Sequence, residues 1–247
     1  MANWNDPRPT GTGFGASPSL SGLQGRSEVF DAGLRRHMLS IYNYMASGVL
    51  LSGIVALLSA SSGMTQVLFG TPLMWLVILS PLAFVMFMSF GANKFSTTAL
   101  QGMFWGFAVA MGLSMSTIFL VYTGASIATT FFATAGAFAG LSLYGYTTQK
   151  NLSGMGSFLI MGLFGIIIAS LINIFLKSSG LQWAISFLGV LIFAGLTAYD
   201  TQRLKEQYAY VAGTEFAGKA VVLGALSLYL DFINMFQFLL QFLGDRR

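Results

Sequence analysis

The chain has 247 residues, of which 55% are apolar and only 8% are charged, with a net charge of +4. Water-soluble domains carry about three times that share of charged residues, so the composition excludes a soluble globule. The absence of cysteine excludes disulfides and thiolate chemistry, and the lack of any dense basic stripe excludes a nucleic-acid partner.

The first 40 residues differ from the rest of the chain. Gly, Ser, Pro and Thr are frequent over residues 10–19, and mixed charges follow from Arg26 to His37. The segment has no continuous apolar core and no small-residue cleavage site, which a signal peptide would require. We therefore expect a disordered cytoplasmic tail over residues 1–40 and a transmembrane domain over residues 41–247.

Seven apolar spans follow, each of about twenty residues and so long enough to cross a hydrocarbon core about 30 Å thick. They are predicted at Ile41 to Ala60, Leu73 to Phe90, Ala99 to Tyr122, Ala128 to Tyr146, Met155 to Leu176, Leu181 to Leu204 and Ala220 to Leu243. The connections are short, so consecutive helices should be antiparallel. The sequence thus predicts an all-α integral membrane protein built as a seven-transmembrane-helix bundle.

The distribution of basic residues predicts the orientation of this bundle. With the N-terminus inside, nine Lys and Arg residues fall on the inner side and three on the outer side, which agrees with the positive-inside rule. We expect a cytoplasmic N-terminus and a periplasmic C-terminus. The absence of eukaryotic sorting signals favours a bacterial inner membrane.

Glycines recur at spacings that allow helix backbones to approach closely in lipid. The candidate pairs are Gly102 with Gly106, Gly136 with Gly140, and Gly162 with Gly165. Each pair predicts a close contact between helices, although glycine is also simply common in membrane helices.

Two acidic residues, Asp200 and Asp231, lie inside apolar spans and are the main functional signal. An ionisable group at membrane depth is costly unless it faces the bundle interior, finds a partner or takes up a proton. Helical spacing places three further polar side chains on the same side of the last span as Asp231. These are Ser227, Asn234 and Gln241, and they predict a polar lining along an ion pathway.

Other interpretations of the two aspartates remain open. Asp231 could be a protonated group with a purely structural hydrogen bond. Asp200 precedes Arg203 by three residues, which is the spacing of an ion pair on a helix surface, so it could form an interfacial salt bridge. The two aspartates come to similar depths only if the sixth helix continues through Glu206 toward Tyr210.

If the aspartates do meet, they cannot both ionise cheaply in a poorly solvated site, so we expect them to share one proton. Loss of that proton would add repulsion between the sixth and seventh spans. It would also expose carboxylate oxygens, the ligands that hard cations such as Ca²⁺ prefer. Asp200 and Asp231 are therefore predicted as a pH sensor and as transient Ca²⁺ ligands, without a tightly bound cofactor.

Two motifs resemble those of the transmembrane Bax inhibitor motif family. They are Leu196-Thr197-Ala198-Tyr199-Asp200-Thr201-Gln202 and Gly224-Ala225-Leu226-Ser227-Leu228-Tyr229-Leu230-Asp231-Phe232-Ile233-Asn234. The segment Gly112-Leu113-Ser114-Met115-Ser116-Thr117-Ile118 also resembles that family. The likeness extends over about Arg35 to Leu243 and is closest to bacterial members.

The resemblance implies a fold whose last helix is central, and a pH-sensitive calcium leak channel in which Asp200 and Asp231 form the sensing pair. It also implies a basic residue near the end of the second span that latches the closed form. The candidate there is Lys94, a lysine where the bacterial calcium-leak type has arginine. Arg203 is the second latch candidate because of its spacing from Asp200.

Two other classes of function compete with a channel. Intramembrane aspartyl proteases also carry Tyr-Asp on one helix and Asp on the next, but the residues before Asp231 are Leu228-Tyr229-Leu230 where those enzymes need Gly-x-Gly. We therefore predict that the protein is not an enzyme. The alternative function is a membrane-embedded regulator that binds another membrane protein, such as a membrane-anchored protease. The expected partners are the lipid bilayer and such a membrane protein. We expect the protein itself to be a monomer.

Overall fold

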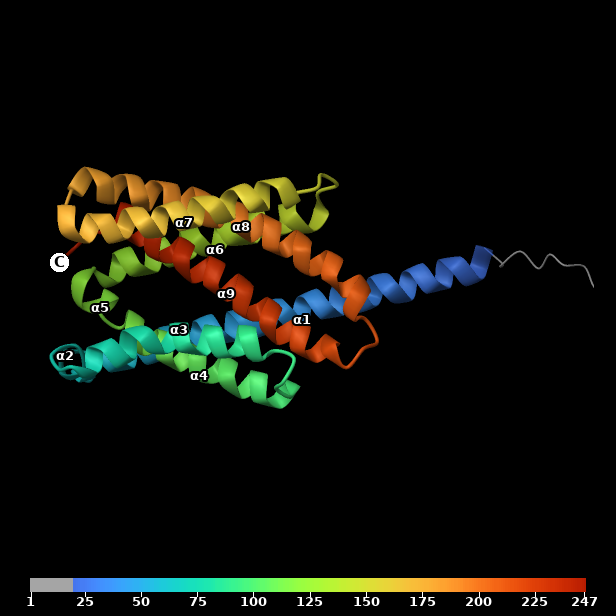
Figure 1. Ribbon diagram of the computed structural model, residues 1–247, viewed down its shortest axis with the longest axis horizontal. Helices are drawn as coiled ribbons and strands as arrows, with labels where there is room; N and C mark the ends of the chain where they lie inside the picture. Colours follow the sequence, from blue (N-terminus) through green and yellow to red (C-terminus); the bar gives the residue numbers. More distant parts are fainter. Residues whose placement is uncertain (1–19) are drawn as a thin grey trace, which may run out of the picture.

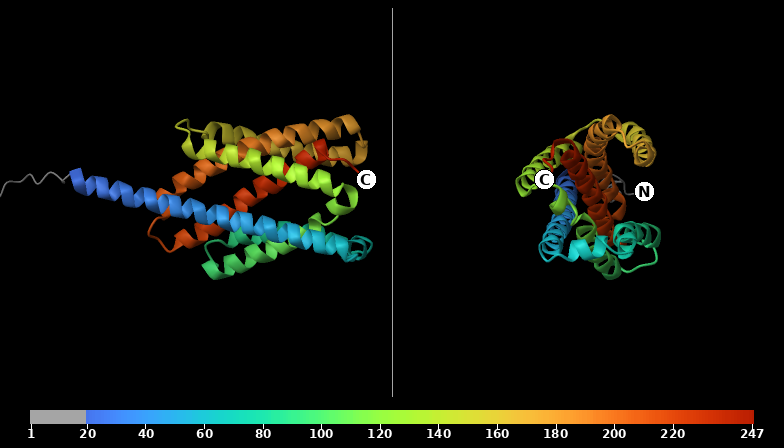
Figure 2. Two further views of the ribbon diagram at one scale, coloured as in Figure 1. Left: turned by 180° about the vertical axis from the view of Figure 1, so that it is seen from behind. Right: turned by 90° about the vertical axis from the view of Figure 1, so that its left-hand side faces the viewer.

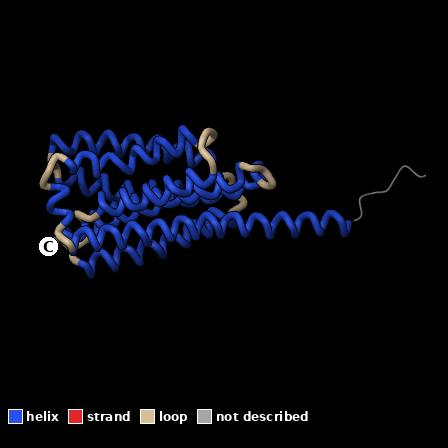
Figure 3. The backbone as a smooth tube through the Cα atoms, turned by 90° about the horizontal axis from the view of Figure 1, so that it is seen from below, coloured by secondary structure: helices blue, strands red, loops and turns tan. Residues whose placement is uncertain are grey.

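The computed structural model describes residues 20–247, which form nine helices joined by short turns (Figures 1 and 3). They are α1 (Leu20–Ser61), α2 (Met64–Phe69), α3 (Leu73–Gly91), α4 (Thr97–Met115), α5 (Ile118–Val121), α6 (Gly124–Thr147), α7 (Ser153–Leu176), α8 (Ser179–Val211) and α9 (Phe216–Leu243). Seven segments are long and apolar enough to cross a membrane, with the short α5 continuing the span begun by α4. The predicted seven-span, all-α membrane fold is confirmed.

The turns gather at two ends of the bundle (Figure 1). One end, called the proximal end below, carries the connections at residues 92–96, 148–152 and 212–215. The other, distal end carries the connections at 122–123 and 177–178, together with the C-terminus. Because each long helix runs from one end to the other, neighbours in sequence are antiparallel, as the short connections predicted.

Helix α1 begins at Leu20 and runs past the proximal end of the bundle (Figure 1). Residues 20–40 are therefore helical, where the sequence analysis predicted a disordered tail; residues 1–19 of that tail lie outside the described part of the chain. The reason is packing, because Leu34 and Met38 are buried at helical spacing and the ring of His37 lies 5.2 Å from that of Tyr208 in α8. These contacts extend the helix beyond the apolar span.

Helix α9 is the most buried of the spans. In the most apolar part of α9, 56% of the residues are buried, whereas in the most apolar part of α7 only 17% are buried. It packs against α1, α3, α4, α6 and α8, whereas α7 packs on α8. The expected central position of the last helix is thus not confirmed, but α9 does contribute a large part of the core.

Tyr229 fixes α9 to two other helices. Its side chain is fully buried, and its hydroxyl lies 2.6 Å from the hydroxyl of Ser52 in α1. Ser52 is also 2.7 Å from the carbonyl oxygen of Ala108 in α4. The ring of Phe107 packs edge-on against the ring of Tyr229, with 4.9 Å between the two ring centres. One buried side chain thereby joins α1, α4 and α9.

The predicted glycine contacts are only partly present. A Cβ atom on Gly106 would stand 3.0 Å from Phe84, and one on Gly162 would stand 2.9 Å from Ile192, so these two glycines do permit close packing. Four others, Gly102, Gly136, Gly140 and Gly165, face open space within 4 Å. The prediction is wrong for those four, because spacing alone does not say which helix face meets a neighbour.

Two glycines outside the predicted pairs permit tighter approaches. A Cβ on Gly145 in α6 would collide with the carbonyl of Ala198 in α8. A Cβ on Gly112 in α4 would stand 2.7 Å from the carbonyl oxygen of Ser52 in α1. Backbone atoms cannot move aside as a flexible side chain can, so these positions hold α6 against α8 and α4 against α1. The first contact is made by Ala198, which lies two residues before Asp200 on α8.

Candidate functional site

Helices α8 and α9 place Asp200 and Ser227 at the same height. Asp200 stands eleven residues before the end of α8 at Val211, and Ser227 stands eleven residues after the start of α9 at Phe216. Since the two helices are joined at the proximal end and pack against each other, equal distances from the turn bring the two side chains level. That distance is about 16 Å of helix, which places the site well inside the bundle.

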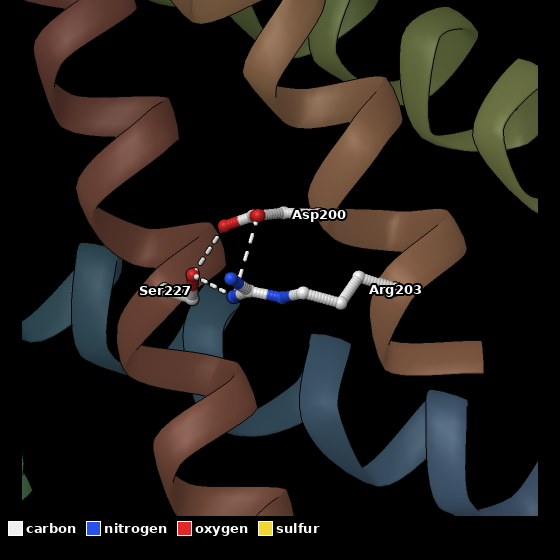
Figure 4. Close-up of polar contacts among 3 residues, drawn as sticks. All are labelled: Asp200, Arg203 and Ser227. Carbon is white, nitrogen blue, oxygen red and sulfur yellow. Dashed lines mark hydrogen bonds and ion pairs between the residues drawn. The ribbon is translucent and has the colours of Figure 1, made fainter. Parts of the chain in front are cut away.

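Three side chains form a closed polar triad at this height (Figure 4). The hydroxyl of Ser227 donates a hydrogen bond to Oδ2 of Asp200. A guanidinium nitrogen of Arg203 lies 3.3 Å from Oδ1 of the same carboxylate and 3.2 Å from the Ser227 hydroxyl oxygen. Asp200 is 7% exposed, so the predicted ion pair with Arg203 exists but is buried on the aspartate side rather than interfacial.

Asp231 is buried in a different way. It lies four residues beyond Ser227 on α9, one helical turn or about 6 Å nearer the distal end, and is 5% exposed. Its Oδ2 atom makes no hydrogen bond with any described residue. A buried polar atom without a partner costs about 1–3 kcal/mol, so the structure retains a destabilising group at this position.

The two aspartates line one cavity without bonding to each other. The cavity has a volume of about 570 Å³ and lies between α7, α8 and α9. Asp200, Arg203, Ser227, Asp231 and Asn234 form its polar side, while apolar side chains of α7 such as Leu163 and Ile166 face them. Within the described residues, Asp200 bonds to Ser227 and Arg203 rather than to Asp231. The two carboxylates are therefore brought together in one site, but separated by a helical turn.

The length of α8 explains why Asp200 reaches this depth. Reckoned from a membrane boundary at Arg203 to Lys205, Asp200 would be about 10 Å shallower than Asp231. The helix instead continues to Val211. The extension past Glu206, which Asp200 and Asp231 need in order to lie at similar depths, is therefore present. The remaining offset is the single turn between Ser227 and Asp231.

A second cavity adjoins the first on the proximal side. It measures about 470 Å³ and is lined by Arg203, Leu204, Glu206, Gln207, Tyr210, Leu223 and Gly224. Arg203 is the one residue that lines both cavities, and 48% of its side chain is exposed. Its guanidinium thus stands at the junction between a polar outer cavity and the inner cavity that holds both aspartates.

The two latch candidates have different positions. Lys94 is exposed in the turn between α3 and α4 and forms no salt bridge in the described structure, whereas Arg203 bonds to Asp200. Lys219 instead ties α9 to this turn, donating to the carbonyl oxygen of Ala92 at 3.2 Å. The basic contact with Asp200 therefore comes from its own helix and not from the second span.

The polar face of α9 divides into two parts. Ser227 and Asn234 line the inner cavity, and the Asn234 amide donates to the carbonyl oxygen of Leu230 at 2.7 Å. Gln241 does not line it. Its side-chain oxygen accepts hydrogen bonds from Gln182 at 2.8 Å and from Ser186 at 3.3 Å, so this residue joins α9 to the start of α8 near the distal end.

Gln202 positions the site and was not among the predicted residues. Its side-chain oxygen accepts a hydrogen bond from the backbone of Leu152, and its amide donates to the carbonyl oxygen of Lys150, both at 2.8 Å. These bonds attach α8 to the turn between α6 and α7 just beyond Asp200. A buried glutamine two residues from a buried aspartate was a usable signal, because buried amides need partners.

A divalent cation would find oxygen ligands in the inner cavity, but few of them. Ca²⁺ takes six to eight oxygens, and residues 29–247 contain no group of three or more His, Cys, Asp or Glu side chains arranged to hold a metal. Two carboxylates with the neighbouring hydroxyl and amide groups fit a passing or weakly held cation better than a resident one.

Comparison with known sequences places this arrangement in a family. The model of the family described as inhibitor of apoptosis-promoting Bax1 matches residues 34–247. The matched region contains α2 to α9 and nearly all of the buried part of α1, so it includes both aspartates and the triad.

Bacterial relatives match over almost their whole length. An uncharacterized protein of Caulobacter vibrioides is 47% identical over 229 residues, which cover 88% of this chain and 91% of the relative. The inner membrane protein YbhL of Escherichia coli K12 is 46% identical over 220 residues, covering 87% and 94%. An uncharacterized protein of Rickettsia prowazekii is 45% identical over 224 residues, covering 90% and 94%.

Proposed function

The chain belongs to the family of inhibitors of apoptosis-promoting Bax1, and from its buried aspartates we propose that it is a proton-gated cation leak channel with Ca²⁺ as a permeant ion. The observation that carries this proposal is that Asp231, whose Oδ2 atom is buried and unpartnered among the described residues, lines the same cavity as the Asp200–Arg203 pair. Intramembrane ionisable residues that face a cavity are characteristic of ion pathways.

Arg203 is the gate in this proposal. It lines both cavities, so a cation that moves between them must pass a guanidinium, which repels it. Asp200 and Ser227 hold the guanidinium at the junction. As long as these contacts persist, the inner cavity is separated from the outer one by a positive charge.

The charge on Asp231 controls how firmly Arg203 is held. With Asp231 ionised, Asp200, Asp231 and Arg203 sum to −1, and the second anion draws the guanidinium further into the junction. With Asp231 protonated the sum is zero, and Arg203 is held by Asp200 and Ser227 alone. Its side chain is then freer to swing into the outer cavity, so cation flux rises as the pH falls.

We further propose that the protein lies in the inner membrane of a bacterium, as the name of the Escherichia coli relative suggests for that relative. The proximal end would face the cytoplasm. Support comes from the basic residues Lys94, Lys150 and Lys219, which lie at or beside the turns of that end, as the positive-inside rule requires of cytoplasmic loops. The outer cavity beside Arg203 would then be the cytoplasmic mouth.

The test is calcium flux into liposomes that contain the purified protein and a trapped calcium-sensitive dye, measured between about pH 5 and pH 8. Wild-type flux should increase toward acid pH. Asp231→Asn mimics the protonated state, so its flux should stay near the acid wild-type level at every pH. Arg203→Gln removes the gating charge and should raise flux at about pH 7.5 by roughly tenfold, since a hydrogen bond to a charged group is worth about 1.5–3 kcal/mol.

Lys205→Gln is the matched control for Arg203→Gln. It removes a positive charge two residues further along α8, from a side chain that bonds to the carbonyl oxygen of Tyr146 and lines neither cavity. Its flux should follow the wild-type curve. Flux through wild-type vesicles equal to that through empty vesicles at every pH would end the channel proposal.

The regulator of another membrane protein is the second candidate. Helix α1 supports it, because it continues beyond the proximal end of the bundle (Figure 1) and carries an exposed Val29 near its start. In this second proposal the projection is the contact for a membrane-anchored partner such as a protease. The same liposomes separate the two candidates, since a regulator predicts no flux and loss of partner binding when residues 1–30 are deleted.

A further inference from the structure

A groove runs between α1 and α6 on the side of the bundle away from the aspartates. Helix α1 packs mainly on α4 and α9, and α6 packs mainly on α8 and α9. Figure 2 accordingly shows α1 and α6 on either side of α9 when the bundle is seen from behind. Two cavities follow one another along this groove, one of about 540 Å³ nearer the proximal end and one of about 300 Å³ nearer the distal end.

The groove follows a continuous face of α1. Its lining residues on α1 run from Arg35 to Ala56 in steps of three or four, which is the repeat of one helix face. Twenty-one residues of helix correspond to about 32 Å, close to the thickness of a hydrocarbon core of about 30 Å. The proximal cavity, from Arg35 to Ala46, corresponds to about 16 Å and therefore to one leaflet.

The proximal mouth of the groove is basic. Arg35 lines the cavity there and forms no salt bridge within residues 29–247. On the opposite wall Tyr146 is covered by Lys205, whose ammonium lies 5.2 Å from the centre of the ring. Below this mouth the walls are apolar, with Met38, Met45 and Phe138 among them. The groove thus combines a positive opening with an apolar interior one leaflet deep.

We propose that this groove is a binding site for one anionic phospholipid of the leaflet at the proximal end. The phosphate lies at Arg35, where an ion pair with a guanidinium is favourable, and one acyl chain lies between α1 and α6 against Phe138. A zwitterionic lipid has the same chains but adds a positive charge beside Arg35, so it binds more weakly. This site is separate from the aspartate cavity and does not depend on the proposed channel activity.

The test is native mass spectrometry of the protein released from detergent micelles, titrated with phosphatidylglycerol or with phosphatidylcholine of the same acyl chains. The first phosphatidylglycerol should bind about fivefold more tightly than phosphatidylcholine, the preference expected for one basic side chain near a lipid surface. Arg35→Gln should abolish this preference and Arg35→Lys should retain most of it. Arg36→Gln is the control, because Arg36 is adjacent and exposed but does not line the groove.

A second pair of variants tests the acyl-chain half of the site. Ala139→Phe fills the groove, whereas Ala137→Phe adds the same ring at an exposed position of α6 outside it. Only the first should weaken the tightest phospholipid binding, while both proteins should unfold at the wild-type temperature in detergent. Equal affinities for the two lipids, equal effects of Arg35→Gln and Arg36→Gln, or a dimer that Ala139→Phe abolishes would each overturn the proposal.

Discussion

Tyr229 and Asp231 are two residues apart on α9 and are both buried, but they differ in whether their polar side-chain atoms have hydrogen-bond partners. The Tyr229 hydroxyl meets Ser52 and through it the carbonyl of Ala108. The Oδ2 atom of Asp231 has no partner among the described residues, and Asp231 lines a cavity that α7 also lines. One face of the helix is therefore hydrogen-bonded to α1, which in turn bonds to α4, and the other carries a carboxyl oxygen without a hydrogen-bond partner among the described residues.

The difference separates the structural role of α9 from its proposed functional role. A satisfied buried hydrogen bond specifies a single arrangement of helices, whereas an unsatisfied carboxyl lowers stability without fixing any neighbour. A protein that needed Asp231 only for packing would do better with an apolar residue. The comparison therefore predicts that substitutions on the two faces change stability in opposite directions.

Tyr229→Ala should have the largest effect. It removes a fully buried aromatic side chain and its hydrogen bond to Ser52, and such truncations cost about 3–5 kcal/mol. Thermal unfolding in detergent micelles, followed by circular dichroism, would measure the loss. An unfolding temperature equal to that of the wild type would show that the junction of α1, α4 and α9 does not hold the bundle together.

Asp231→Leu should stabilise the protein by about 1–2 kcal/mol, because it replaces an unpartnered buried carboxyl with an apolar side chain. The same substitution should reduce calcium flux in liposomes to the level of empty vesicles, since leucine offers no oxygen to a cation. Stabilisation with undiminished flux would contradict the proposed role of Asp231 in transport. Destabilisation would mean that Asp231 has a partner in the membrane.

Ser227→Ala should have the smallest effect. Ser227 bonds to both Asp200 and Arg203, and a hydrogen bond between helices in a membrane is worth about 0.6 kcal/mol on average. The weaker hold on Arg203 should raise calcium flux at neutral pH about threefold, the factor that corresponds to this energy. Asn234→Ala is the comparison, because Asn234 lines the same cavity but bonds to the backbone of its own helix.

Most of the fold could be predicted from the sequence, while the boundaries could not. Apolar runs of about twenty residues identified all seven spans, because lipid tolerates little else. The start of α1 at Leu20 was missed, and the extension of α8 to Val211 was left as an open alternative. In both places the helix extends past the apolar run through contacts such as the one between His37 and Tyr208, which join segments far apart in the chain.

The sequence by itself determined that this is a membrane protein of seven spans with two acidic residues inside apolar spans, because hydropathy and charge are properties of each segment alone. Only the tertiary structure decided that Asp200 is held by Ser227 and Arg203 while Asp231 has no partner among the described residues. Those facts depend on how α8 and α9 align across the turn that joins them. Such an alignment is a relation between helices, and no single segment contains it.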